Sequence, residues 1–149
     1  MIRTKDLQIG DLLRVNRDGL CIKKGTIVEV RAVDADDKLI GGGLIGAAHC
    51  RPLDDNQFDG GIWCEYLDPL PLTPEILEKN GWIWEDKEVL YLYLEINGYK
   101  VVECLPHISD TAIHCILFYE GKRLRITIQF VHQLQHCLRL VGIKKEITI

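Results

Sequence analysis

The pattern that most constrains the fold is an amphipathic helical repeat near the C-terminus, over residues 130–141. Its apolar residues recur at the spacing of one helix face: Phe130, Val131, Leu134, Cys137, Leu138 and Val141. Gly142 follows this pattern, and glycine is favoured just after the end of a helix because it readily adopts a left-handed backbone. In residues 143–149 apolar and polar side chains alternate, as in a short strand. A helix with one apolar face needs an apolar surface to cover, so the pattern predicts a helix packed on a sheet.

The residues before this helix predict that sheet. Two antiparallel hairpins are expected, over residues 89–105 and 112–128, because apolar and polar side chains alternate in each arm. Asn97-Gly98 is a strong signal for a tight hairpin turn, and Glu120-Gly121 is expected to turn the second hairpin. The helix would cover the leucine and isoleucine face of the sheet.

A proline-rich segment divides the chain. Residues 68–72, Asp-Pro-Leu-Pro-Leu, cannot form a central strand because proline has no backbone donor. Thr73 is a favourable N-cap and Pro74 a favourable first helical residue, which predicts a short helix over 74–79. We therefore expect a first module at 1–70, a boundary with a short helix at 71–81, and the antiparallel sheet with its helix at 82–149.

The first module is predicted to contain short strands, at residues 9–15, 26–33 and 62–67. Residues 34–37 are expected to form a turn, and residues 41–46 and 54–61 are expected to form loops. Several short strands with tight turns in about seventy residues are typical of a small antiparallel barrel of the SH3-like kind. The predicted fold class is thus α+β and mostly β: an N-terminal SH3-like small barrel plus a C-terminal antiparallel sheet covered by one amphipathic helix.

Composition favours a soluble globular protein, since 47% of the 149 residues are hydrophobic and 27% are charged. No apolar stretch is long enough to span a bilayer and no secretory leader is evident, so we expect a cytoplasmic protein. The formal net charge of −4 argues against general nucleic acid binding. The six cysteines form no C-x-x-C pair, which favours reduced core thiols over disulfides.

No motif predicts catalysis, a cofactor or a metal. The only serine is Ser109, which has no nucleophile elbow around it, and the glycine run at 41–46 lacks the Lys-Ser/Thr of a phosphate-binding loop. His132 and His136 are spaced to share a helix face and a metal, but no third ligand is evident, so we interpret them as polar residues on a solvent-facing side. We predict a protein that is not an enzyme and acts by binding.

The candidate ligand-binding residues lie on the polar face of the predicted sheet and at the module boundary. Tyrosine rings beside guanidinium groups suit stacking on a base and pairing with a phosphate. The alternative is that these tyrosines cover the sheet or pack on another module or subunit. Trp82 is expected, with Trp63 and Trp84, to build a core between the modules or to line a cleft there. The candidates are Tyr91, Tyr93, Tyr99, Arg123, Arg125, Trp63 and Trp84.

Two stretches, residues 69–82 (PLPLTPEILEKNGW) and 131–135 (VHQLQ), resemble a family of small uncharacterised proteins of Bacteroides-type bacteria, their phages and their mobile elements. The resemblance implies an N-terminal β-module joined to a sheet that ends in this helix. It also implies a phage or mobile-element origin and a cytoplasmic location in a bacterial host. It implies no activity and no catalytic residue.

Phages encode small proteins that sequester the nucleotide signals of host immunity, so the expected ligand is a small anionic, nucleotide-like molecule. On an acidic protein, a local pocket can bind two phosphates where the whole surface would repel a long polyanion. The alternative is a protein-binding adaptor without a small-molecule ligand. We also expect a homo-oligomer, most simply a dimer, because Ile147-Thr148-Ile149 is predicted to form a strand with an exposed edge. The alternative is that this strand pairs within its own sheet.

Overall fold

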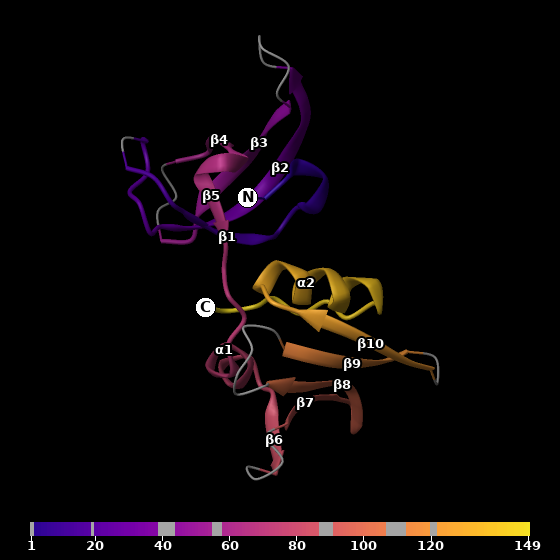
Figure 1. Ribbon diagram of the computed structural model, residues 1–149. Coiled ribbons are helices and arrows are strands. Elements are labelled where there is room, and N and C mark those ends of the chain that lie inside the picture. Colours follow the sequence, from indigo (N-terminus) through magenta and orange to yellow (C-terminus); the bar gives the residue numbers. More distant parts are fainter. Residues whose placement is uncertain are drawn as a thin grey trace. The chain divides into compact units, whose positions relative to one another are not determined.

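The computed structural model describes residues 2–18, 20–38, 44–54, 58–86, 91–106, 113–119 and 122–149. The chain divides into two compact units, Met1–Leu70 (unit 1) and Pro71–Ile149 (unit 2), and each contains one five-stranded antiparallel sheet (Figure 1). Helices are few and short. None of the helices in the described ranges is long and apolar enough to cross a membrane.

Unit 1 is a sheet with strand order β4-β3-β2-β1-β5. The last strand returns beside the first, since β5 pairs with β1. No pairing between the described residues joins β4 to β5, so the sheet is open and the closed barrel is not confirmed. The strands are β1 (Leu12–Val15), β2 (Ile27–Lys38), β3 (Leu44–Pro52), β4 (Gly60–Trp63) and β5 (Leu67–Pro69), with short 3₁₀ helices η1 (Thr4–Asp6) and η2 (Cys64–Tyr66).

The predicted turn at 34–37 is wrong, because these residues belong to β2. The β2–β3 register shifts between Asp34 and Asp37, so an irregularity accommodates the polar run inside the strand. The loop predicted at 41–46 is also wrong in part, since Leu44–Gly46 begin β3; residues 41–43 lie outside the described residues. A glycine at position 46 of this strand leaves room for Thr4, because a Cβ there would lie 1.8 Å from Cγ2 of Thr4.

The loop predicted at 54–61 is wrong at its end, because Gly60 and Gly61 begin β4. Residues 55–57 lie outside the described residues.

The core of unit 1 follows from the alternation of its strands. Leu13 and Val15 of β1 and Val28 and Val30 of β2 are fully buried within one apolar cluster.

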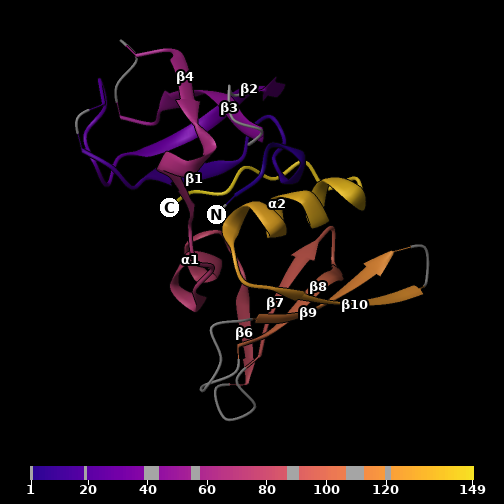
Figure 2. The same ribbon diagram turned by 45° about the horizontal axis from the view of Figure 1, so that its top comes forward.

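Unit 2 has strand order β10-β9-β8-β7-β6, with every neighbouring pair antiparallel (Figure 1). The α2 helix follows β10 directly and lies against the sheet (Figure 2). The elements are α1 (Pro74–Lys79), β6 (Ile83–Asp86), β7 (Tyr91–Ile96), β8 (Tyr99–Pro106), β9 (Ile113–Tyr119), β10 (Lys122–Ile128) and α2 (Val131–Leu140).

The local signals in unit 2 predict these elements well. The α1 helix has the predicted bounds, and Thr73 caps it by accepting a hydrogen bond from the Ile76 amide. The α2 helix differs from its predicted range by one residue at each end, with Gly142 at φ +76° beyond it. The first hairpin turns at Asn97-Gly98, where φ is +53° and +79°. The second expected turn, Glu120-Gly121, lies outside the described residues.

The C-terminal tail is not a strand, which corrects the prediction for residues 143–149. Asn80, at the end of α1, holds it instead. Its side-chain amide donates to the Thr148 carbonyl at 2.7 Å, and its side-chain oxygen accepts from the Thr148 amide at 2.8 Å. Ile147 is buried. The tail therefore does not present the strand edge from which we expected an oligomer, and the oligomeric state stays a prediction.

One face of the unit 2 sheet, here called the inner face, is apolar and buried. Along β7 the buried residues are Leu92 and Leu94, and they lie opposite Cys104 and Val102 of β8.

His132 of α2 is also buried, with its ring stacked on that of Phe130 at 5.9 Å between centroids. The interpretation of His132 as a solvent-facing residue is therefore wrong.

Candidate functional site

The opposite face of this sheet, here called the outer face, carries Tyr91, Tyr93, Arg123 and Arg125 of the predicted site residues. Directly opposed residues share a face, and one row crosses the whole sheet: Arg125, Ile116, Glu103, Tyr93 and Ile83. The sequence thus placed these side chains on the correct face. Arg125 and Tyr93 are separated by three strand spacings, about 14 Å, so the tyrosines and arginines form two ends rather than one cluster.

At the tyrosine end of the outer face, Glu85, Tyr91 and Lys100 contact one another. Glu85 accepts hydrogen bonds from the Tyr91 hydroxyl and from the Lys100 ammonium group. The Lys100 ammonium lies 4.5 Å from the Tyr93 ring centroid and 5.6 Å from that of Tyr91. Positive and negative groups are therefore paired at this end.

The pKa values follow from this pairing. The Lys100 ammonium, and then the Tyr91 hydroxyl, hold the pKa of Glu85 below its ordinary value. The same carboxylate raises the pKa of Lys100 and that of Tyr91. Lys100 thus stays charged and bound to Glu85 at neutral pH, and it is a poor nucleophile.

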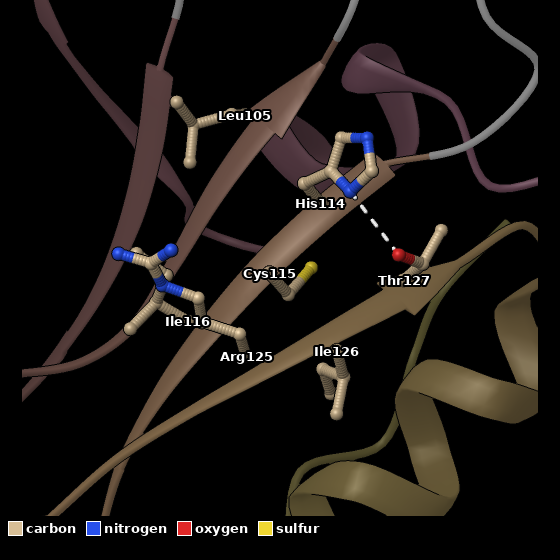
Figure 3. Close-up of a pocket in the computed structure, with 7 residues that line it drawn as sticks. All are labelled: Leu105, His114, Cys115, Ile116, Arg125, Ile126 and Thr127. Carbon is tan, nitrogen blue, oxygen red and sulfur yellow. Dashed lines mark hydrogen bonds between the residues drawn. The ribbon is translucent and has the colours of Figure 1, made fainter.

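The arginine end contains a hollow of about 400 Å³, here called the Arg125 hollow (Figure 3). Its size falls within the range of small-molecule sites, and such sites combine an apolar lining with a few polar groups. Arg125 and Thr127 come from β10, His114 and Ile116 from β9, and Leu105 from β8. Cys115 and Ile126 complete the lining.

His114 forms one hydrogen bond to a described residue at this hollow. Its Nδ1 lies 3.1 Å from the Thr127 hydroxyl, directly across the β9–β10 ladder (Figure 3). No other bond of the ring is formed with the described residues, so Nε2 is the ring atom left to meet a ligand. Arg125 supplies a fixed charge with a planar fork of donors. The hollow can therefore hold an anionic group beside an apolar body.

The remaining predicted site residues lie elsewhere. Arg123 lies over the ring of Phe118, at 5.2 Å from the centroid, and does not line the hollow. Tyr99, at the first hairpin turn, is 75% exposed. Trp84 belongs to unit 2, where its indole N–H donates to Glu78 of α1, and Trp63 belongs to β4 of unit 1.

Four of the six cysteines, Cys50, Cys64, Cys104 and Cys115, are buried, and burial disfavours the reactive thiolate. Cys104 and Cys115 face each other across β8 and β9 with sulfur atoms 2.9 Å apart, and both are buried. The contact with Cys104, together with burial, raises the pKa of Cys115, and burial raises that of Cys50 to about 12. Within the described ranges, no group of three or more metal-binding side chains is found.

Comparison with family models, with curated proteins and with solved structures found no match for the chain. The site must therefore be interpreted from its own geometry.

Sequence patterns missed three residues of this face. His114 and Thr127 are thirteen residues apart in the sequence and become neighbours only through the β9–β10 register. Lys100 reaches the tyrosines because the β7–β8 register shifts between Leu94 and Glu95. Alternation alone could have put His114 on the face of Ile116, because the two are two residues apart on one strand.

Proposed function

We propose that this chain is a non-catalytic binding protein that holds a small anionic, nucleotide-like molecule in the Arg125 hollow. The observation that supports this most is that Arg125 and His114 line one hollow together, with Nδ1 of His114 3.1 Å from the Thr127 hydroxyl. Arg125 would pair with a phosphate and His114 would donate to it. Leu105 and Ile116 would contact the base or sugar.

The charge balance of the outer face supports the same location. Glu85 neutralises Lys100 at the tyrosine end, so an anion there would meet a paired cation and a carboxylate. Neither Arg125 nor His114 forms an ion pair with any described carboxylate. Our proposal is therefore limited to the arginine end of the predicted tyrosine–arginine site.

The biological setting is a proposal that rests on sequence resemblance. Residues 69–82 and 131–135 support a phage or mobile-element origin, and such an origin would suit the sequestration of an immune nucleotide signal in a bacterial cytoplasm. The SH3-like character of unit 1 is likewise proposed, supported by the return of β5 beside β1 and by bulges in the long β2. Homo-oligomerisation remains a proposal as well.

The test is a thermal-shift screen against cyclic and linear nucleotides, with the hit confirmed by calorimetry. A ligand at 100 times its Kd should raise the free energy of unfolding by about 2.7 kcal/mol. Arg125→Ala should weaken binding at least about tenfold, because a charge-assisted pair is lost. Arg14→Ala is the matched control, since it removes an exposed guanidinium from β1 of unit 1.

Two results would contradict the proposal. One is the absence of any shift with every nucleotide, which would favour the adaptor alternative. The other is equal weakening by Arg125→Ala and Arg14→Ala, which would indicate only general charge attraction.

A further inference from the structure

The outer edge of β10 differs from every other sheet edge that the structure describes. β10 is seven residues long and pairs with β9 in an unbroken register from Lys122 to Ile128. β4 and β5 are the edges of unit 1 and are only four and three residues long. β6 has four residues and an irregular register with β7. Long regular edges are the ones that accept another strand.

The two sides of β10 have different chemistry. Lys122, Arg123, Leu124 and Arg125 are all exposed. Arg123 and Arg125 project on the outer face, whereas Leu124 and Ile126 project on the opposite side, where Leu124 is 41% exposed. The edge thus combines backbone groups that no described strand pairs, two arginines on one side, and Lys122 with the exposed side chain of Leu124 on the other, in a chain whose net charge is −4.

We propose that the β10 edge, residues Lys122–Ile128, is a docking site for an extended acidic segment of another protein, which adds to the sheet as a further antiparallel strand. Backbone hydrogen bonds supply the affinity in this mode of binding, and alternate side chains supply the specificity. The matching segment has acidic residues toward Arg123 and Arg125 and apolar residues toward Leu124 and Ile126. The proposal does not depend on the nucleotide site.

A second copy of this chain fits the edge poorly. Antiparallel pairing of two β10 strands would set Lys and Arg side chains against one another, and like charges directly opposite are destabilising. The acidic β6 edge of another copy is a weak candidate, because it is short and irregular and its Glu85 is already bound to Lys100.

The probe is a fluorescein-labelled heptapeptide of alternating glutamate and valine, and binding is followed by fluorescence anisotropy with the full chain. It should bind at least about tenfold more tightly than the matched lysine–valine peptide. The peptide nitrogens form two alternate sets, and only one set donates hydrogen bonds to β10. N-methylation of that set should abolish binding, whereas N-methylation of the other set should not. Equal binding of the acidic and basic peptides, or no effect of N-methylation of either set, would overturn the proposal.

A charge swap tests the site itself. Lys122→Glu with Arg123→Glu should weaken the acidic peptide about tenfold and strengthen the basic one, which a merely unfolded variant could not do. The matched control reverses Lys23 and Lys24, two exposed lysines of unit 1, and should change neither. Loss of acidic binding without a gain in basic binding would overturn the proposal.

Two further measurements separate this inference from other outcomes. Light scattering should give one mass for the wild type and for the Lys122→Glu/Arg123→Glu variant; a dimer that the reversal alters would assign the edge to self-association and overturn the proposal. Nucleotide binding is measured on the same samples. Since neither Lys122 nor Arg123 lines the Arg125 hollow, nucleotide binding should survive the reversal, and the two proposals can fail separately.

Discussion

The two faces of the unit 2 sheet are built from the same strands but differ in burial and in charge. The inner face buries Leu92, Leu94, Val102 and Leu117 at 3% exposure or less. On the outer face most side chains are half-buried or exposed. At the tyrosine end Lys100 forms an ion pair with Glu85, whereas at the arginine end Arg125 forms no ion pair with a described carboxylate. The comparison teaches that the presence of tyrosine and arginine on one face does not define a binding site. What matters is which of those groups already have partners.

The inner face should dominate stability. Leu92→Ala, at a fully buried position, removes apolar contacts and leaves a cavity, so we expect the free energy of unfolding to fall by about 2–5 kcal/mol. Tyr99→Ala, at the exposed hairpin turn, should change it by no more than about 0.5 kcal/mol. Urea denaturation of both variants measures the difference. Similar losses at the two positions would mean that the faces are not distinguished as the structure has them.

The inner face should also be sensitive to high pH through its thiols. The pKa of Cys115 is raised above the ordinary 9.0 by its contact with Cys104 and by burial. The protonated thiol therefore contributes stability that is complete below pH 9 and declines above it, as the unfolded chain ionises first. The loss is about 1.4 kcal/mol per pH unit.

Cys115→Ala should accordingly reduce the loss of stability between pH 8 and pH 10.5 by about 2 kcal/mol. Cys21→Ala is the matched control, because it removes an exposed cysteine from unit 1. Denaturation at both pH values gives the slopes. Identical slopes for wild type and Cys115→Ala would show that this thiol ionises in the folded protein.

Local signals predicted the elements more reliably than the site. Thr73-Pro74 fixed the start of α1, and Asn97-Gly98 fixed the first hairpin, because each acts through its own backbone geometry. The polar run at 34–37 was misread as a turn because a bulge can absorb it inside a long strand. Alternation identified the outer face correctly.

What alternation could not provide was the neighbour of each side chain. The separation of Tyr93 from Arg125 depends on a sheet order in which β8 and β9 lie between β7 and β10. The pairing of Glu85 with Lys100 depends on residues fifteen positions apart and on a register shift. The tail was missed for the same reason, since Asn80 reaches Thr148 across 68 positions.

The two ends of the outer face should differ in binding. With any nucleotide that binds, His114→Ala should raise the Kd several-fold, by about 1 kcal/mol, because a donor to the phosphate is lost. Tyr91→Phe should leave the Kd unchanged, because the Tyr91 hydroxyl already donates to Glu85. Isothermal titration calorimetry gives both values. A Kd that rises with Tyr91→Phe and not with His114→Ala would move the site to the tyrosine end.

The smallest expected effect is the titration of Glu85 at the paired end. Its pKa lies below the ordinary 4.5 because Lys100 and Tyr91 donate to it. The interaction therefore stabilises the fold above the pKa of the unfolded chain and is lost as pH falls through the lower folded value. Since the carboxylate is exposed, solvent screens most of this contribution, and NMR titration measures it better than denaturation does. Lys100→Gln should move the midpoint upward toward 4.5, whereas Arg123→Gln, which alters a cation near the other end, should not. A midpoint unmoved by Lys100→Gln would mean that the tyrosine end is not neutralised by this pair, and its two rings would again be candidates for a ligand.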